Sequence, residues 1–205
     1  MALMRRRSGG DRDGGSSGRV DWLIVGLGNP GERYARTRHN VGFETAALLG
    51  ERWGLSRARK RYAGLYTDGR TGPGGPRVGL LLPQTYMNEA GRSAGPARGA
   101  LGVELDHLLV LHDEIDLSFG RVEARLGGGL AGHNGLKSLK RELGGPDFQR
   151  VRIGVGRPDS TDPEIVSAHV LGRFAEPADE VRALVERAAD EAERVVRDRS
   201  PADRG

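Results

Sequence analysis

The stretch G-L-G-N-P-G-E-R-Y-A-R-T-R-H-N, residues 26–40, determines how the rest of the chain is interpreted. An apolar run before it, residues 22–25, predicts a buried strand, and the apolar pattern of residues 41–53 predicts a helix. Between them lie a glycine-rich turn and a polar loop that carries His39. This arrangement is typical of a site at the carboxyl end of a strand.

The same stretch contains the pattern G-x-G-x-x-G, which also occurs in dinucleotide-binding proteins. That class of site needs a helix beginning at the last glycine and an acid about 20 residues further on, at the end of the next strand. Here the chain stays polar through Arg38, and Glu51 falls in the tail of a predicted helix. The surroundings therefore argue against a dinucleotide site.

Length and composition limit the class of protein. A chain of 205 residues fits one domain with a proper core. The absence of cysteine excludes disulfides, thiolate metal sites and a cysteine nucleophile. No apolar run has the length of a transmembrane span, and the N-terminus lacks the apolar segment of a signal peptide. We expect a cytoplasmic protein that does not contact membranes.

The net charge of +4 is unevenly distributed. Residues 1–19 hold five Arg and two Asp and little that is apolar, which predicts a disordered extension. The folded domain is expected over residues 20–199, with a short tail at 200–205. Inside the domain, residues 120–157 carry eight Lys or Arg and three acids. This excess predicts a surface for a polyanion, although charge alone leaves an ordinary solvated face as an alternative.

Apolar runs and chain breakers predict an α/β fold. Strands are expected at residues 22–26, 63–67, 78–82, 108–111, 122–126 and 151–155, and helices at 41–53, from 88 onward, at 136–143 and at 177–199. In the first helix, Phe43, Ala47 and Leu48 are expected to share one apolar face. Pro96 lies inside the second helix and removes a hydrogen bond, so a kink or an early end is expected there. The predicted architecture is a single domain with a twisted mixed β-sheet flanked by helices, a three-layer α/β/α sandwich.

Four blocks that carry reactive or polar side chains follow one another along the chain: G-L-G-N-P-G with T-R-H-N, P-x-T-x-M-N, H-D-E-I-D-L, and G-x-x-x-x-G-H-N-G-L-K. With V-R-I-G-V-G-R-P after them, the chain resembles bacterial peptidyl-tRNA hydrolases from about residue 20 to residue 193. The resemblance implies hydrolysis of the ester between a peptide and the 3′-terminal ribose of tRNA. On this resemblance, free tRNA is expected to return to translation and stalled ribosomes to be rescued. It implies no cofactor, and a monomer is expected.

The resemblance places the catalytic histidine at His39 and its partner carboxylate at Asp113. Chemistry agrees, because a neutral imidazole takes a proton from water near pH 7, and a carboxylate on its other nitrogen fixes its tautomer. A histidine alone in a loop is more often a surface residue, so the surrounding motif carries this assignment.

The resemblance also implies a set of substrate-binding side chains. Amides both donate and accept hydrogen bonds, which suits a peptide backbone, a ribose or a developing oxyanion. Alternatives remain at three of these positions: Asn88 can be a helix cap, Met87 a core residue, and His133 a plain loop residue. Asn40, outside this set, can likewise be a helix cap. The expected set is Asn29, Tyr34, Tyr86, Met87, Asn88, His133 and Asn134.

Two arginines match the family's tRNA phosphate clamp, Arg125 and Arg152, and Lys137 and Lys140 on the next helix extend the basic surface. Phosphate contacts give affinity without reading sequence, which suits an enzyme that serves many tRNAs. Arg152 has an alternative role, because a mid-strand arginine can pair with a buried acid instead.

Other classes of function have less support. The five histidines show no H-x-x-x-H spacing, so no metal is expected, and no G-x-S-x-G turn indicates a serine nucleophile. Leu130 and Ala131 depart from the Ser, His or Gly common in relatives, which puts substrate contacts of that loop in doubt. The alternative is a non-catalytic RNA-binding protein on the same scaffold, as some plant organelle splicing factors are. The retention of His39, Asp113 and the three asparagines argues against it.

Overall fold

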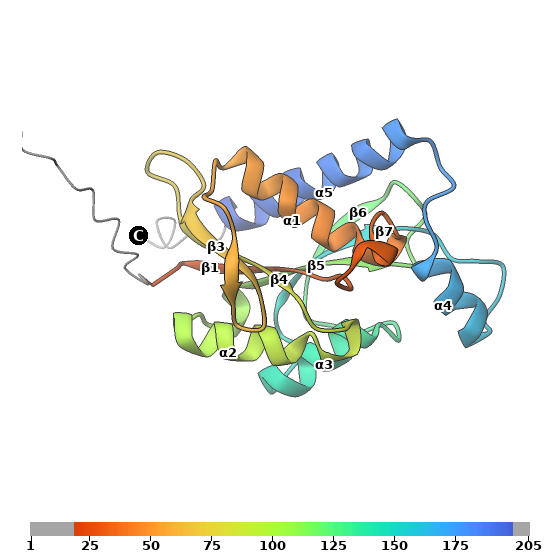
Figure 1. Cartoon of the computed structure of the whole chain (residues 1–205), viewed down its shortest axis with the longest axis horizontal. Coiled ribbons are helices and arrows are strands. Elements are labelled where there is room, and N and C mark those ends of the chain that lie inside the picture. The colour runs from red at the N-terminus through yellow and green to blue at the C-terminus, as the bar shows by residue number, and fades with distance from the viewer. Residues whose placement is uncertain (1–18, 199–205) are drawn as a thin grey trace, which may run out of the picture.

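The computed structural model describes residues 19–198 (Figure 1). The predictions for the N-terminal extension and the C-terminal tail fall outside this range, Arg19 excepted. A seven-stranded sheet has the order β2-β3-β4-β1-β5-β7-β6. The central strands β4, β1, β5 and β7 run parallel, whereas the β2–β3, β3–β4 and β6–β7 pairings are antiparallel. The strands are β1 Trp22–Gly26, β2 Arg59–Arg61, β3 Gly64–Arg70, β4 Arg77–Pro83, β5 Leu108–Glu114, β6 Val122–Leu126 and β7 Gln149–Gly154.

Helices cover both faces of this sheet. In Figure 1, α1 (Val41–Arg52) and α5 (Ala178–Asp198) lie on one side, and α2 (Gly91–Leu101) and α3 (Asn134–Leu143) lie on the other. Alternate residues of β1 face the two sides, as the pleat requires: Trp22 and Ile24 join the core under α1 and α5, and Leu23 and Val25 join the core over α2 and α3. The predicted mixed sheet and three-layer α/β architecture are confirmed.

Of the kink or early end expected at Pro96, the early end is wrong, because α2 continues to Leu101, and the kink stays a prediction. Pro96 is exposed, and so is Arg92, whose carbonyl would have been its partner. Water can therefore serve that carbonyl. Burial of Ala94 and Ala97 in the core holds the helix together across the proline.

Of the apolar face expected on α1, Ala47 is wrong because it is exposed, whereas Phe43 and Leu48 are half-buried and Leu48 packs against the core. The fully buried residues include Thr45, Ala46 and Leu49. Gly42 sets this orientation. A Cβ at Gly42 would lie 2.3 Å from the carbonyl oxygen of Leu111, so the helix touches the backbone of β5 at that point.

Two elements were not predicted. One is the edge strand β2, whose sequence R-K-R gives no apolar signal. The other is α4 (Pro163–Leu171), which stands apart from the layers beside the carboxyl ends of the strands (Figure 1). The side-chain oxygen Oδ1 of Asp162 accepts a hydrogen bond from the backbone N–H of Glu164, and Pro163 lies in the first turn of the helix. This D-P-E signature of a helix start was present in the sequence.

Candidate active site

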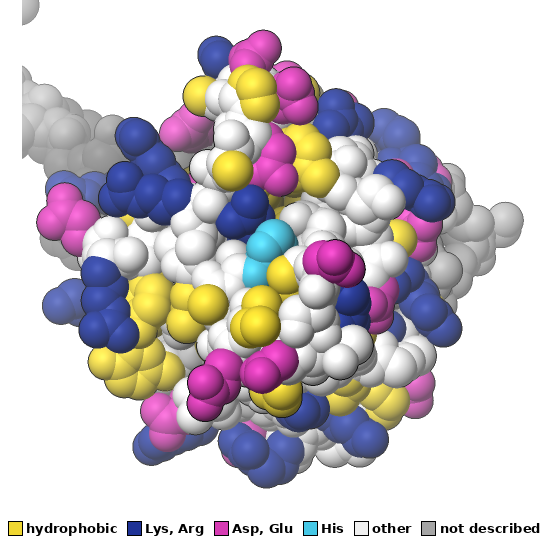
Figure 2. Space-filling model, turned by 90° about the vertical axis from the view of Figure 1, so that its right-hand side faces the viewer, with side chains coloured by type: hydrophobic (Ala, Val, Ile, Leu, Met, Phe, Trp, Pro, Cys, Tyr) yellow, Lys and Arg dark blue, Asp and Glu magenta, His cyan; other side chains and the backbone are white. Residues whose placement is uncertain are grey.

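The candidate site is a cavity of about 700 Å³ at the carboxyl ends of β1, β4 and β5. Figure 2 views the molecule from this side, and histidine atoms lie near the centre of the face among hydrophobic side chains. Lys137 lines this cavity, and so do all the predicted catalytic and substrate-binding residues. These are Asn29, Tyr34, His39, Tyr86, Met87, Asn88, Asp113, His133 and Asn134. The fold therefore brings together residues that are scattered over four sequence blocks.

Asp113 lies between two histidines. The Nδ1 atom of His39 is 2.8 Å from Oδ1 of Asp113 and 3.0 Å from Oδ2, and Nε2 of His133 is 2.9 Å from Oδ1. His133 caps α3, since its Nδ1 accepts from the N–H groups of Gly135 and Leu136 at 3.1 and 3.4 Å. Its proton must then be on Nε2, which donates to Asp113. His133 thus supports Asp113 as well as lining the cavity.

These contacts set the protonation of the pair. Burial raises the pKa of Asp113, but the charges and hydrogen bonds of His39 and His133 outweigh burial and hold it well below its usual range. Burial lowers the pKa of His39, but the Asp113 charge and hydrogen bond prevail and raise it above 6.5. Asp113 is therefore an anion that orients the Nδ1–H of His39, and Nε2 of His39 is left to accept a proton.

His112 neighbours the pair in sequence but has a different role. It is fully buried, and burial is the main reason that its pKa falls to about 3. Its Nδ1–H donates to the backbone oxygen of Asp113 at 2.8 Å. A neutral, enclosed imidazole of this kind does not exchange protons with substrate, and it stabilises the end of β5.

Asn29 is held from three directions. Asn40 accepts from the backbone N–H of Asn29 at 2.8 Å and donates to its backbone oxygen at 3.0 Å. The side-chain oxygen of Asn29 accepts from the N–H of Met87 at 2.8 Å. This contact leaves the NH₂ group of Asn29 as its donor toward the cavity. Asn40 makes no capping bond to α1, so its role is to position Asn29, which sequence reasoning missed.

The other predicted substrate residues differ in exposure. Asn88 and Asn134 are exposed, and their side chains make no hydrogen bond within the described residues, which leaves them available to a ligand. Tyr86 is 59% exposed at the rim. Met87 is 4% exposed and belongs to the core over α2 and α3, so a core role applies to most of its side chain.

The predicted phosphate-binding residues lie in two places. Lys137 lines the cavity, and with Lys140 it lines an adjoining hollow of about 470 Å³. Arg125 and Arg152 lie on β6 and β7, outside the cavity lining. Arg152 pairs with buried Glu114, Nε to Oε2 at 3.1 Å, which is the alternative that its mid-strand position left open.

The cavity also has a wall that the sequence motifs did not reveal. Apolar residues of α4, Val166, Val170 and Leu171, line it, although none of the α4 residues is buried. Arg38, the neighbour of His39 in the sequence, contacts the segment that follows α4. Its Nη1 donates to the backbone oxygen of Arg173 at 2.6 Å, and its Nη2 pairs with Glu176 at 3.2 Å.

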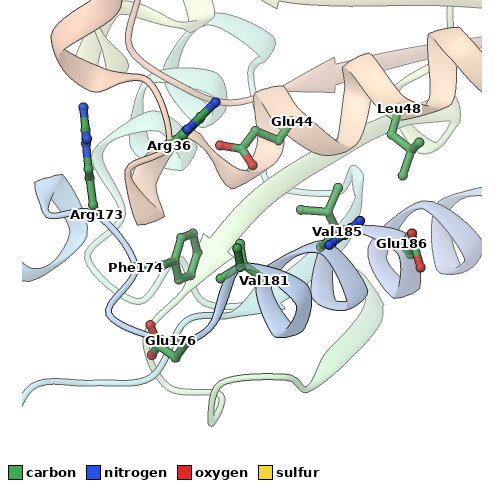
Figure 3. A pocket seen from close by; sticks show the side chains of 11 residues that line it. Arg36, Glu44, Leu48, Arg173, Phe174, Glu176, Val181, Val185 and Glu186 are labelled. Atoms are coloured by element: carbon green, nitrogen blue, oxygen red, sulfur yellow. The ribbon is translucent and has the colours of Figure 1, made fainter.

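A second cavity, of about 670 Å³, lies between α1 and the start of α5 (Figure 3). Phe174 and Glu44 face one another across it, and Val181 forms part of its floor. Burial raises the pKa of Glu44, and Arg36 opposes that shift. The lining contains none of the predicted catalytic or substrate-binding residues, so the cavity is separate from the candidate site.

His39, Asp113 and His133 also have the spacing of a metal-binding group, with ligand atoms within 4.8 Å of one another. Sequence spacing did not reveal this group. Nδ1 of His39 and Nε2 of His133 both donate hydrogen bonds to Asp113, and a metal ion would have to replace both bonds. The expectation of a metal-free site stays a prediction.

Comparison with known proteins now decides the family. The sequence profile of the family described as Peptidyl-tRNA hydrolase matches residues 23–203. The chain belongs to the peptidyl-tRNA hydrolase family. Members of this family hydrolyse peptidyl-tRNA, so the chain is an ester hydrolase of translation.

Individual relatives agree with this assignment. A peptidyl-tRNA hydrolase of Anaeromyxobacter dehalogenans (strain 2CP-C) is 47% identical over 170 residues, which cover 82% of this chain and 86% of the relative. One from Mycobacterium avium (strain 104) is 48% identical over 178 residues, covering 85% and 90%. The crystal structure of peptidyl-tRNA hydrolase from Acinetobacter baumannii superposes with a TM-score of 0.73 at 36% identity, covering 89% of this chain and 96% of that one. Among residues 19–198, no helix is long and apolar enough to span a membrane.

Proposed function

We propose that His39 activates the water that hydrolyses peptidyl-tRNA in this protein. The observation that carries this proposal is the His39–Asp113 contact at 2.8 Å, in a cavity where Nε2 of His39 has no hydrogen-bond partner among residues 19–198. Water gives a proton to Nε2 and attacks the ester carbonyl. Asp113 stabilises the imidazolium that forms. The imidazolium then returns the proton to the leaving 3′-oxygen of the ribose, which yields a peptide acid and free tRNA.

Asn29 supplies the donor for the charge that develops on the carbonyl oxygen. Its NH₂ group is its donor on the cavity side, and the bonds from Met87 and Asn40 hold the amide in place. A preorganised donor of this kind is worth roughly 10²–10³-fold in kcat. Met87 contributes through its backbone N–H, whatever the role of its side chain.

Asn88 and Asn134 bind the peptide backbone on this proposal, since their exposed amides line the cavity. Tyr34, Tyr86 and His133 complete the polar and aromatic lining. The apolar residues of α4 offer a wall to peptide side chains. Apolar contacts do not discriminate strongly between side chains, which suits a substrate class of mixed peptides.

The tRNA backbone lies against the basic residues on this proposal. Lys137 and Lys140 extend from the cavity into the adjoining hollow, and Arg125 and Arg152 provide cations on β6 and β7. A monomer in the cytoplasm, where tRNA is available, fits this role and needs no metal or membrane.

Release of N-acetyl-amino acid from N-acetyl-aminoacyl-tRNA tests the mechanism. In the presence of EDTA the wild-type protein should cleave, and His39→Ala should lose roughly 10²–10⁴-fold in kcat, the usual worth of a general base, while still binding tRNA. His107→Ala, a histidine outside the cavity lining, is the control. Turnover by His39→Ala at the wild-type rate would remove His39 from the mechanism. Absence of cleavage by the wild type would favour a non-catalytic RNA-binding protein.

A further inference from the structure

The antiparallel pair β6–β7 presents a group of arginines around one carboxylate. Glu123 lies directly opposite Arg152 in the register, and Arg125 lies opposite Arg150. Val122 and Ala124 pack against the core under α1 and α5, so Glu123 and Arg125 belong to the opposite face of the strand. Within the described residues, Arg125 is exposed and makes no ion pair.

Two arginines hold the Glu123 carboxylate. Nη2 of Arg121 donates to Oε1 at 2.8 Å, and Nη1 of Arg152 donates to Oε2 at 3.0 Å. A carboxylate with one guanidinium on each oxygen has the contacts that a phosphate group would receive from the same two arginines, because both anions accept paired N–H bonds from guanidinium.

Arg152 is bound unequally by its two acids. Glu114 is 3% exposed and receives Nε of Arg152 at 3.1 Å, whereas the side chain of Glu123 is 37% exposed. Half-exposed ion pairs contribute little to stability, and a long side chain at the surface is free to leave. Glu114 would keep Arg152 in position after Glu123 had moved away.

We propose that the Glu123 carboxylate occupies the place of a tRNA backbone phosphate in the free protein. It binds Arg121 and Arg152 until a phosphate of the tRNA displaces it. The inference rests on the phosphate contacts proposed above for Arg125 and Arg152. Glu123 then determines affinity, since each phosphate that docks must replace an existing ion pair and turn the carboxylate out toward water. This raises KM and leaves the chemistry at His39 unchanged.

Substitution of Glu123 by glutamine tests the proposal through a gain of affinity, which damage to the fold does not produce. Glu123→Gln keeps the size of the side chain and removes its charge. KM for N-acetyl-aminoacyl-tRNA should fall about two- to fivefold, the worth of one half-exposed ion pair. The gain should shrink as salt is added, and kcat should not change. A minimal substrate, N-acetyl-aminoacyl-adenosine without an acceptor stem, should show no gain.

Glu51→Gln is the matched control, because it changes the net charge equally at an exposed position near the end of α1, on an element that supplies none of the arginines around Glu123. If Glu123→Gln leaves KM unchanged while Arg125→Ala raises it, the phosphate surface stands and the proposed role of Glu123 is overturned. If Arg125→Ala and Arg152→Ala also leave KM unchanged in stable proteins, the phosphate surface itself fails. A rise in KM for Glu123→Gln would show that Glu123 orders Arg152 for substrate, which also overturns the proposal.

Discussion

At the scale of the residue, the site depends on hydrogen bonds that fix which nitrogen of each imidazole carries a proton. The backbone amides at the start of α3 assign the tautomer of His133, and His133 and His39 then both donate to Asp113. Asp113 therefore acts as the common acceptor of two imidazoles, and its charge keeps Nε2 of His39 basic.

The pH dependence of catalysis should reflect this pair. His39 works as a base only when it is neutral, and its pKa is raised above 6.5, so kcat/KM should rise with pH through a midpoint above 6.5. Asp113→Asn removes the raising effects and leaves burial, which lowers the pKa. The midpoint should move down, and the rate should fall roughly 10²–10⁴-fold because the amide favours the wrong tautomer. Profiles of kcat/KM from pH 5 to 9 check this, with Asp106→Asn as the control. If Asp113→Asn leaves the midpoint of the pH profile unchanged, Asp113 does not set the pKa of His39.

Asn29 offers a second test at this scale. Asn29→Asp keeps the shape and can still accept from the N–H of Met87, but it replaces the donor toward the cavity by an anionic oxygen. We expect kcat to fall by roughly 10²–10³-fold with a melting temperature near that of the wild type. Equal kcat values for the two proteins would show that the amide NH₂ does not contact the reacting oxygen.

At the scale of the element, the sequence predicted parts of the structure whose signal is local. The apolar runs located β1, β5 and β7, and the motifs pointed to His39, Asp113 and the asparagines, which the fold brings to one cavity. Pro96 misled the prediction, since packing of Ala94 and Ala97 decides whether α2 continues. The Asn40–Asn29 and His133–Asp113 contacts were not predicted, because no motif pairs these residues and only the fold brings their side chains together.

Two glycines of α2 test the effect of helix propensity and the effect of close packing on stability independently. A Cβ at Gly99 meets no atom of the described residues within 4 Å, whereas a Cβ at Gly91 would lie 2.4 Å from the backbone oxygen of Ser138 on α3. Gly99→Ala should stabilise the protein by about 0.5–1 kcal/mol. Gly91→Ala should destabilise it and raise KM, since α3 begins next to His133 and would be displaced. Denaturant unfolding and KM measured on both variants check this, and a stabilised Gly91→Ala protein would contradict the packing argument.

At the scale of the whole molecule, the proposed chemistry and the proposed tRNA binding use adjoining regions. On the proposed function, the cavity at the strand ends holds the reacting ester, and the basic residues of α3 continue from it over the adjoining hollow. Residues 120–157 therefore supply both the end of the site and its electrostatic surroundings, which explains why the positive charge concentrates there on a nearly neutral domain.

Lys140 tests whether this surface binds the backbone of tRNA. It is exposed and lines the hollow beside the cavity, outside the catalytic lining. Lys140→Ala should raise KM for N-acetyl-aminoacyl-tRNA and leave kcat unchanged, because a phosphate contact is made equally in the ground and transition states. The slope of log K against log salt should flatten by about 0.7–0.9, because the variant neutralises one phosphate fewer. Lys60→Ala on β2, at the far edge of the sheet, is the matched control. If Lys140→Ala and Lys60→Ala give the same KM and the same salt slope, the basic residues of α3 form only a solvated face, and tRNA must approach the cavity from the side of Arg125 and Arg152.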